Sequence, residues 1–204
     1  MTGGLPQLFG TGLGLSAAAG LNSYAVLLVY GAMARFFPED YPGTIARLLS
    51  SSPALSAAAV LFLLEFFADK IPGLDHFWHL LHSFVRPVVG ALVAIAVVQP
   101  EGSTVLDVVA GGSGGAVALV SHLVKSATRL TSTALTAGVA NVALSFAEDV
   151  VAFLQSLVSI FLPLVALVVV IAIGLIFILT VPRMARFLDL FGRRRQGHEA
   201  PPPA

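Results

Sequence analysis

The chain contains no cysteine among its 204 residues. This absence excludes disulfide bonds, catalysis by a thiolate and zinc sites built from cysteine ligands. Charged residues are also scarce, at 11% of the chain, whereas a soluble domain carries about 25%. The 11 basic and 11 acidic residues cancel, so no net charge attracts nucleic acid. No nucleotide-binding fingerprint is present either, and we expect neither a cofactor nor a nucleic-acid partner.

Hydrophobic residues, by contrast, make up 57% of the chain, and its mean hydropathy is +0.92. Several apolar stretches reach or approach the roughly 20 residues that a helix needs to cross a bilayer. These stretches are continuous rather than alternating, which favours helices, because a helix satisfies its own backbone hydrogen bonds in lipid. The sequence therefore predicts an all-α, polytopic transmembrane helix bundle whose main partner is the lipid bilayer.

Proline, glycine and charged residues divide the apolar stretches into six expected crossings, two of them broken. Residues 1–182 would form a single transmembrane domain, followed by a basic, proline-rich cytoplasmic tail over 183–204. Pro53 suits the first turn of a helix, and Pro87 should kink the helix that contains it. The expected helices cover residues 8–36, 53–68, 74–98, 104–129, 133–149 and 150–181, the last containing Pro163.

Three pairs of features recur in the same order and suggest an internal repeat of residues 8–99 and 103–181. Each unit would hold three crossings, and an odd number makes the two units inverted in the membrane, as in many transporters. The pairs are Gly12 and Gly14 with Gly112 and Gly114, the stretch 64–69 with 144–149, and Pro87 with Pro163.

The distribution of lysine and arginine predicts the orientation of the six crossings. If both termini are cytoplasmic, nine basic residues lie on the inside and only Arg35 and Arg47 on the outside. Cytoplasmic segments carry the excess of basic residues, so we expect both termini to be cytoplasmic.

Four short elements resemble a known family. They are Gly20-Leu-Asn-Ser-Tyr24, Ala68-Asp-Lys-Ile-Pro-Gly73, His82-Ser-Phe-Val-Arg-Pro87 and Glu148-Asp149. Together they resemble an uncharacterised bacterial integral-membrane family that is catalogued only as a domain of unknown function. The resemblance implies a bacterial cytoplasmic membrane, but it brings no substrate and no reaction.

The stretch 68–87 holds the first candidate site. Asp69 and Lys70 either end a helix at the membrane surface or lie partly inside the membrane facing the bundle, where charges are usually paired or functional. Four further residues, Asp75, His79, His82 and Arg86, follow at spacings of four, three and four and therefore share one helical face. These side chains could bind a metal ion, a proton or an anion, or they could serve only structural polar packing. The positive charge of Arg86 argues against a metal ion.

A second candidate site combines Asn141, Ser145, Glu148 and Asp149, either as a cation or proton site or as interhelical hydrogen bonds. Asn22 and His122 lie within long apolar stretches, where polar residues more often serve packing, and Glu65 precedes Asp69 in the repeated element. His122, Lys125 and Arg129 form a basic stripe whose lower end we expect at lipid phosphate or in the cytoplasm. The GGSGG run at 111–115 favours close helix packing, because no phosphate-binding Gly-Lys follows it.

The leading functional hypothesis is a small transporter or channel for an ion or small polar solute, which a homodimer could form. The residues expected to carry it are Asp69, Lys70, His82, Arg86, Asn141, Glu148 and Asp149, with Asn22, Glu65, Asp75, His79 and His122 as secondary candidates. The alternative is a non-transporting membrane scaffold or lipid-interacting subunit. A third hypothesis is an intramembrane enzyme with His82 as general base. Of the three it is the one we favour least, so we expect the protein not to be an enzyme.

Overall fold

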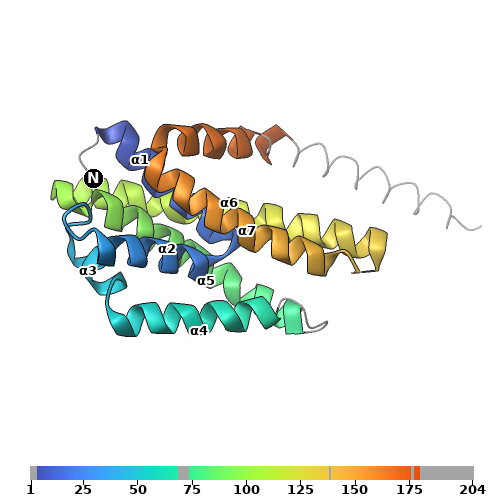
Figure 1. Cartoon of the computed structure of the whole chain (residues 1–204). Helices are drawn as coiled ribbons and strands as arrows, with labels where there is room; N and C mark the ends of the chain where they lie inside the picture. The colour runs from blue at the N-terminus through green and yellow to red at the C-terminus, as the bar shows by residue number, and fades with distance from the viewer. Residues whose placement is uncertain (1–3, 69–73, 138, 176, 180–204) are drawn as a thin grey trace, which may run out of the picture.

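The computed structural model describes residues 4–68, 74–137, 139–175 and 177–179, and for 74–79, 134 and 135 it describes only the backbone. Within these ranges the chain forms helices joined by turns, with no strand, so the all-α prediction is confirmed (Figure 1). The elements are α1 (Leu5–Leu21), α2 (Ser23–Phe36), α3 (Thr44–Leu49), α4 (Ser52–Ala68), α5 (Leu74–Val98), η1 (Gln99–Glu101), α6 (Thr104–Thr136) and α7 (Asn141–Phe161), followed by the apolar helix Pro163–Leu179.

The surface of the bundle is apolar and part of its interior is charged. Phe84, Val88 and Leu130 are 72%, 67% and 73% exposed, whereas Glu65 and Arg86 are completely buried. This distribution is the reverse of that in soluble proteins and indicates a protein embedded in lipid. Three helices are long and apolar enough to cross a membrane, namely Leu80–Glu101, Thr104–Thr133 and Asn141–Phe161.

The stretch predicted as one helix over 8–36 is instead a hairpin of α1 and α2, and the prediction of one crossing there is wrong. Asn22 separates the two helices in an extended conformation, with φ −147° and ψ 106°. Its side-chain Oδ1 accepts hydrogen bonds from the backbone N–H groups of Tyr24 and Ala25, at 3.1 and 2.9 Å. This is the N-cap arrangement that starts a new helix. The sequence reading missed it because apolar residues continue on both sides of Asn22.

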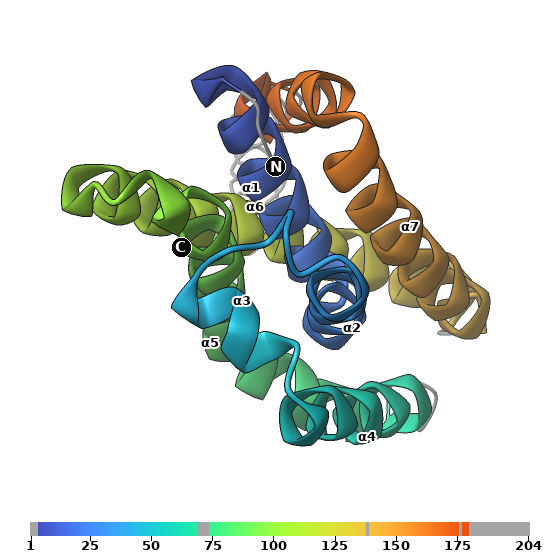
Figure 2. The same ribbon diagram turned by 60° about the vertical axis from the view of Figure 1, so that its left-hand side comes forward.

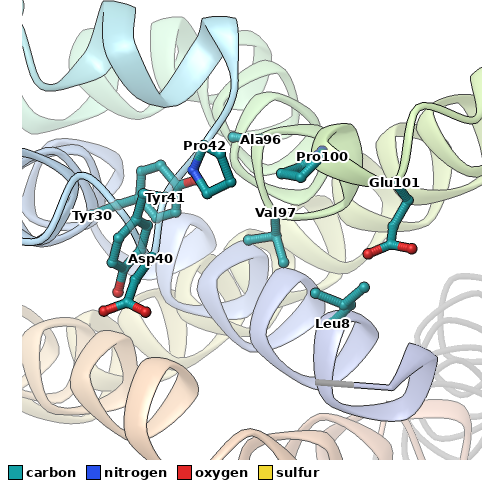
Figure 3. A pocket seen from close by; sticks show the side chains of 9 residues that line it. All are labelled: Leu8, Tyr30, Asp40, Tyr41, Pro42, Ala96, Val97, Pro100 and Glu101. Atoms are coloured by element: carbon teal, nitrogen blue, oxygen red, sulfur yellow. The ribbon is translucent and has the colours of Figure 1, made fainter. Parts of the chain in front are cut away.

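Both ends of the hairpin lie at the same end of the bundle. Leu8 of α1 lines the same small cavity as Tyr30 of α2 and Tyr41 of the following loop (Figure 3). In Figure 1, α2 runs back toward α3, and the turn between α6 and α7 lies at the opposite end. We call these the α3 end and the α6–α7 end. The turn at Asn22, the hairpin tip, therefore lies inside the bundle.

Small residues allow α1, α5 and α6 to pack closely. A side chain at Gly114 of α6 would lie 2.7 Å from the carbonyl oxygen of Gly90 in α5 and 2.8 Å from Ser16 Oγ in α1. Ser16 Oγ donates a 2.8 Å hydrogen bond to that same carbonyl. Close packing of this kind replaces the hydrophobic effect as the main attraction between helices in lipid. The prediction that the GGSGG run serves helix packing therefore holds at Gly114.

The second half of the chain also departs from the predicted helices. Helix α6 continues to Thr136, and α7 passes through Glu148 and Asp149 without a break. The break lies at Leu162, the residue that follows the last residue of α7, because Pro163 comes next. The predicted helices over 74–98 and 53–68 are found as α5, which contains Pro87, and α4, whereas the kink predicted at Pro87 stays a prediction. The inverted repeat is not confirmed, since unbroken α6 would be the counterpart of the α1–α2 hairpin.

The count of basic residues used to predict the orientation also needs correction. Arg86, Lys125 and Arg129 were counted as cytoplasmic, but all three side chains are buried within the bundle. The expectation that the stripe containing Lys125 and Arg129 ends at lipid phosphate or in the cytoplasm is therefore wrong. Only basic residues outside the helices can report on orientation.

Candidate functional site

The hairpin tip interrupts a helix inside the bundle and leaves the last carbonyl groups of α1 without helical donors. Each of the last three finds another donor. Ser23 Oγ donates to Ala19 O at 3.0 Å, Arg86 Nη1 donates to Gly20 O at 2.7 Å, and Lys125 Nζ donates to Leu21 O at 2.8 Å. Positive charge is favourable here because the C-terminus of a helix carries a partial negative charge.

Gly20 is the residue that lets the tip approach α6. A Cβ atom at this position would lie 2.4 Å from Ala118 O and 2.5 Å from Ser121 Cβ. A side chain here would force α1 away from α6 and would lengthen the hydrogen bond from Lys125 to Leu21 O. Three residues of the Gly20–Tyr24 element thus have a local role, since Gly20 permits contact, Asn22 makes the turn and Ser23 caps a carbonyl.

One cluster of charged groups surrounds Arg86, and we call it the Glu65 cluster; it comprises Glu65, His82, Arg86 and His122. Arg86 Nη2 lies 2.7 Å from Glu65 Oε1, and the side chains of both are at most 1% exposed. His82 Nε2 lies 3.8 Å from the same oxygen, and the ring of Tyr24 meets His82 edge to face at 5.5 Å. The cluster joins α4, α5 and α6 to the hairpin tip.

The contacts of His122 define its tautomer. Arg86 Nη1 lies 2.9 Å from His122 Nδ1, and a guanidinium can only donate, so Nδ1 is the acceptor. The proton of a neutral imidazole is then on Nε2, which lies 3.1 Å from Ser83 Oγ and donates to it. His122 therefore acts as a neutral acceptor for Arg86 and adds no charge to the cluster.

A second cluster lies on the other side of the tip, and we call it the Glu148 cluster; it comprises Asn22, Lys125, Arg129, Glu148 and Asp149. Arg129 donates from Nη2 and Nε to Glu148 Oε2, at 2.7 and 3.0 Å, and Lys125 Nζ lies 3.3 Å from the same oxygen. Asn22 Nδ2 donates to Asp149 Oδ1 at 2.8 Å. The turn residue itself is thus tied to α7.

The two clusters are balanced in charge. With the histidines neutral, three carboxylates lie among three cations, so the formal charge is zero. Burying an ion costs several kcal/mol, and in the bilayer such groups persist only when paired. The carboxylates are Glu65, Glu148 and Asp149, and the cations are Arg86, Lys125 and Arg129.

The structure brings together most, but not all, of the predicted site residues. Asn141 lies apart, because its side chain donates to Thr133 Oγ1 at 2.8 Å on the exposed turn between α6 and α7. Asp69 and Lys70 lie outside the described residues, as do the side chains of Asp75 and His79. The predicted residues found in the two clusters are Asn22, Glu65, His82, Arg86, His122, Glu148 and Asp149.

Sequence reasoning missed the role of Lys125, Arg129 and the carbonyl groups at the tip. The spacing of His122, Lys125 and Arg129 shows that they share one helical face, but it does not show that this face is buried, because the helix was expected to end at residue 129 and instead continues to Thr136. Among the described residues, no group of three side chains could hold a metal ion.

Three cavities lie apart from the two clusters. A cavity of about 20 Å³ at the α3 end, enough for one water molecule, is lined by Leu8, Tyr30, Tyr41 and Glu101 among others (Figure 3). Burial, followed by the charge of Asp40, raises the pKa of Tyr41 from 10.0 to about 12. A second cavity, of about 280 Å³, opens beside Met33 and Phe161, and a third, apolar and of about 150 Å³, opens between Ala17, Val117 and Val170.

Comparison with known proteins gives one match. Residues 9–183 match the model of a family described as a domain of unknown function, DUF4126. No curated protein and no solved structure matches the chain.

Proposed function

Because the chain belongs to the DUF4126 family, which assigns no activity, we propose a function from the site itself: transport of an ion or small polar solute across the membrane. The observation that carries the proposal is the hairpin tip, where cations from two helices bind the free carbonyl groups of α1 and also pair with acids. Interrupted helices with charged partners near the bilayer centre are the usual construction of solute sites in transporters.

The depth of the tip supports this proposal. Within the apolar span Leu80–Glu101, Arg86 lies six residues from the start, about 9 Å of helix, and its side chain is fully buried. We infer that the guanidinium lies within the bilayer core, which is about 30 Å thick. Ionisable residues at that depth are costly and usually mark a pathway for ions, protons or polar solutes.

The arrangement also suggests how a ligand would bind. Lys125 Nζ lies between Leu21 O and Glu148 Oε2, the kind of position that a transported cation would take. Arg86 takes the corresponding place between Gly20 O and Glu65 Oε1. Since the two clusters are neutral as a whole when the histidines are neutral, a charged ligand would compete with one of these pairings.

The hairpin changes the orientation that we propose. Because α2 returns to the α3 end, the described start of α1 and the exposed Arg47 of α3 lie on one side, and the C-terminal helix leads toward the other (Figure 1). In the sequence, Lys70 follows α4 and five arginines follow residue 182, so we propose that the α6–α7 end, toward which α4 and the C-terminal helix run, is cytoplasmic in a bacterial inner membrane. This orientation replaces the expectation that both termini are cytoplasmic. A homodimer remains part of the proposal.

The alternative is a membrane scaffold that transports nothing. It is favoured by the completeness of the pairing, since each carboxylate already has a polar partner, and by the broad apolar surface of α4, α6 and α7. In that case the clusters would only fix the register of the helices.

Transport can be tested with purified protein reconstituted into liposomes. Currents on a solid-supported membrane would be recorded after rapid jumps in H⁺, Na⁺, K⁺, chloride or phosphate concentration. We expect a current with at least one of these ions, and we expect Asp149→Asn to abolish it. The matched control is Glu101→Gln, which neutralises an exposed acid on η1 and should leave the current unchanged. Signals equal to those of empty liposomes for every ion would reject transport and leave the scaffold.

A further inference from the structure

Helix α4 is attached to the bundle in an unusual way. Of its seventeen residues, only Ala58, Glu65 and Ala68 are buried. Its large apolar side chains, such as Leu63 and Phe67, are more than half exposed. Figure 2 shows α4 at the edge of the bundle, and it packs mainly on α2. The helix therefore lacks the apolar anchoring that holds α1, α5 and α6 together.

The two ends of α4 are held by different interactions. At its start, Arg35 of α2 donates to Ser50 O and Ser52 Oγ, at 3.3 and 2.9 Å, and Leu55 packs over Gly31. Toward the α6–α7 end, among the described residues, Glu65 forms a buried ion pair with Arg86 of α5, and His82 Nε2 of α5 lies 3.8 Å from the same carboxylate oxygen. We expect a change in the charge of Glu65 to loosen this end of α4 while leaving its first turn in place.

The carboxylate of Glu65 has room to accept a proton. Glu148 accepts hydrogen bonds from Arg129 and lies against Lys125, whereas among the described residues Glu65 pairs with one arginine, Arg86. Glu65 Oε2 is buried and accepts no hydrogen bond from the described residues, so a proton can be added there without displacing a donor. Within the part of the chain that the structure describes, the ionisable groups that face Glu65 are His82 and Arg86 of α5 and Tyr24 of α2, with His122 of α6 behind Arg86.

We propose that Glu65 is the proton-binding residue of this protein, and that its protonation releases the α6–α7 end of α4 from Arg86 and exposes the guanidinium of Arg86 beside the hairpin tip. This proposal rests on the proposed transport function and identifies the proton as its coupling ion. Protonation removes the charge that attracts Arg86. It also turns Oε2, a buried oxygen without a hydrogen-bond partner among the described residues, into an O–H donor that must find an acceptor.

Arg86 does not lose all its partners when α4 leaves. Its Nη1 still donates to Gly20 O and lies against His122 Nδ1. The tip therefore keeps its shape, while the guanidinium gains a free side on which an anionic solute or a returning carboxylate can bind. Proton binding and solute access would be linked through this one side chain, because a ligand shifts an equilibrium only by binding the two states differently.

The absence of cysteine makes the movement of α4 measurable. Spin labels would be attached to Phe67→Cys on α4 and Leu130→Cys on α6, two exposed positions, in the full chain reconstituted in liposomes. Pulsed electron–electron double resonance would give the distance distribution from about pH 4 to pH 9, a range that brackets the titration of ordinary carboxyl and imidazole groups. The control pair, Ser56→Cys with Val105→Cys, reports on the fixed start of α4.

We expect a second, longer distance to appear at low pH for the pair at positions 67 and 130 and not for the control pair. If one proton drives the change, the ratio of the two populations should change about tenfold per pH unit within the transition. Glu65→Gln should give the longer distance at every pH, and Glu101→Gln should leave the pH dependence of the wild-type protein unchanged.

A distance distribution that does not change with pH in the otherwise wild-type protein would overturn the proposal, and this result needs no variant at Glu65. The proposal is also overturned if the Glu65→Gln variant folds and its distance distribution between positions 67 and 130 still changes with pH. Ion-jump currents that persist despite an unmoved α4 would leave transport intact and reject only the proton site. A pH-dependent α4 without any current would keep the proton site and reject transport.

Discussion

Neutralising Glu148 is the most direct test of the idea that the buried charges are balanced. The Glu148→Gln substitution keeps the size of the side chain but leaves Lys125 and Arg129 with one carboxylate fewer. Both cations lie within 3.3 Å of Glu148 Oε2 and are at least 90% buried. Breaking a buried pair in this way costs about 3–5 kcal/mol, because an uncompensated charge stays in the interior.

The loss can be measured as a fall in thermal stability in detergent, following the fraction of protein that remains monodisperse after heating. A loss of 3–5 kcal/mol should lower the melting temperature by roughly 6–20 °C, if the scaling for soluble chains of 150–250 residues applies. Glu101→Gln, at an exposed acid, should change the stability by less than about 0.5 kcal/mol.

A second substitution separates charge balance from loss of packing. Lys125→Met restores the balance by removing one cation, so Glu148→Gln combined with Lys125→Met should be more stable than the sum of the single changes predicts, by about 0.5–3 kcal/mol. If Glu148→Gln alone is as stable as Glu101→Gln, or if the double variant shows only additive losses, the argument from charge balance is wrong.

Two further predictions concern the hairpin and the α3 end. Asn22→Ala should lower the free energy of unfolding by about 0.5–2 kcal/mol for the lost N-cap, and by more because Asp149 also loses a hydrogen-bond donor. Asn141→Ala, on the exposed turn, should lower it by less. Equal losses in thermal melts would contradict the role of Asn22. The pKa of Tyr41 is raised from 10.0 to about 12, so its contribution to stability should be complete below pH 10 and should be lost as the pH rises from 10 to about 12. In thermal melts at alkaline pH, Tyr41→Phe should reduce this fall in stability. If stability falls with pH as steeply in the variant as in the wild-type protein, the assignment to Tyr41 is wrong.

Much of the helical fold could be predicted from the sequence, because the apolar stretches and the prolines are local signals. Pro53 and the turn at Gln99–Glu101 mark real helix ends, and Pro87 lies inside α5 as expected. The hairpin could not be predicted in this way. A single asparagine within an apolar stretch reads as packing, and only its contact with Asp149, which is 127 residues away, shows that it ends one helix and begins another.

The candidate site was predicted more fully on its acidic side than on its basic side. Glu65, Glu148 and Asp149 stand out in a chain with few charges, and the structure buries all three. Lys125 and Arg129 were expected to face phosphate or cytoplasm, because their helix was expected to end at residue 129. The helix continues to Thr136, and this extension puts both bases within the bundle. Because one helix end was predicted wrongly, the basic residues of the site were predicted to lie at the surface.

The contacts of the hairpin tip have a consequence for how the protein is made. The tip is synthesised early, but its partners Arg86, Lys125 and Asp149 follow at distances of 66, 104 and 127 residues. At roughly 5–20 residues per second, the last of them is added about 6–25 s after Asn22. Until Arg86 and then Lys125 are added, the hairpin has free carbonyl groups and no cations to bind them, and Asn22 has no acidic partner before Asp149. The hairpin therefore reaches its native contacts only after the later helices are made, and a nascent chain that stops before α7 would present an incomplete tip to the insertion machinery.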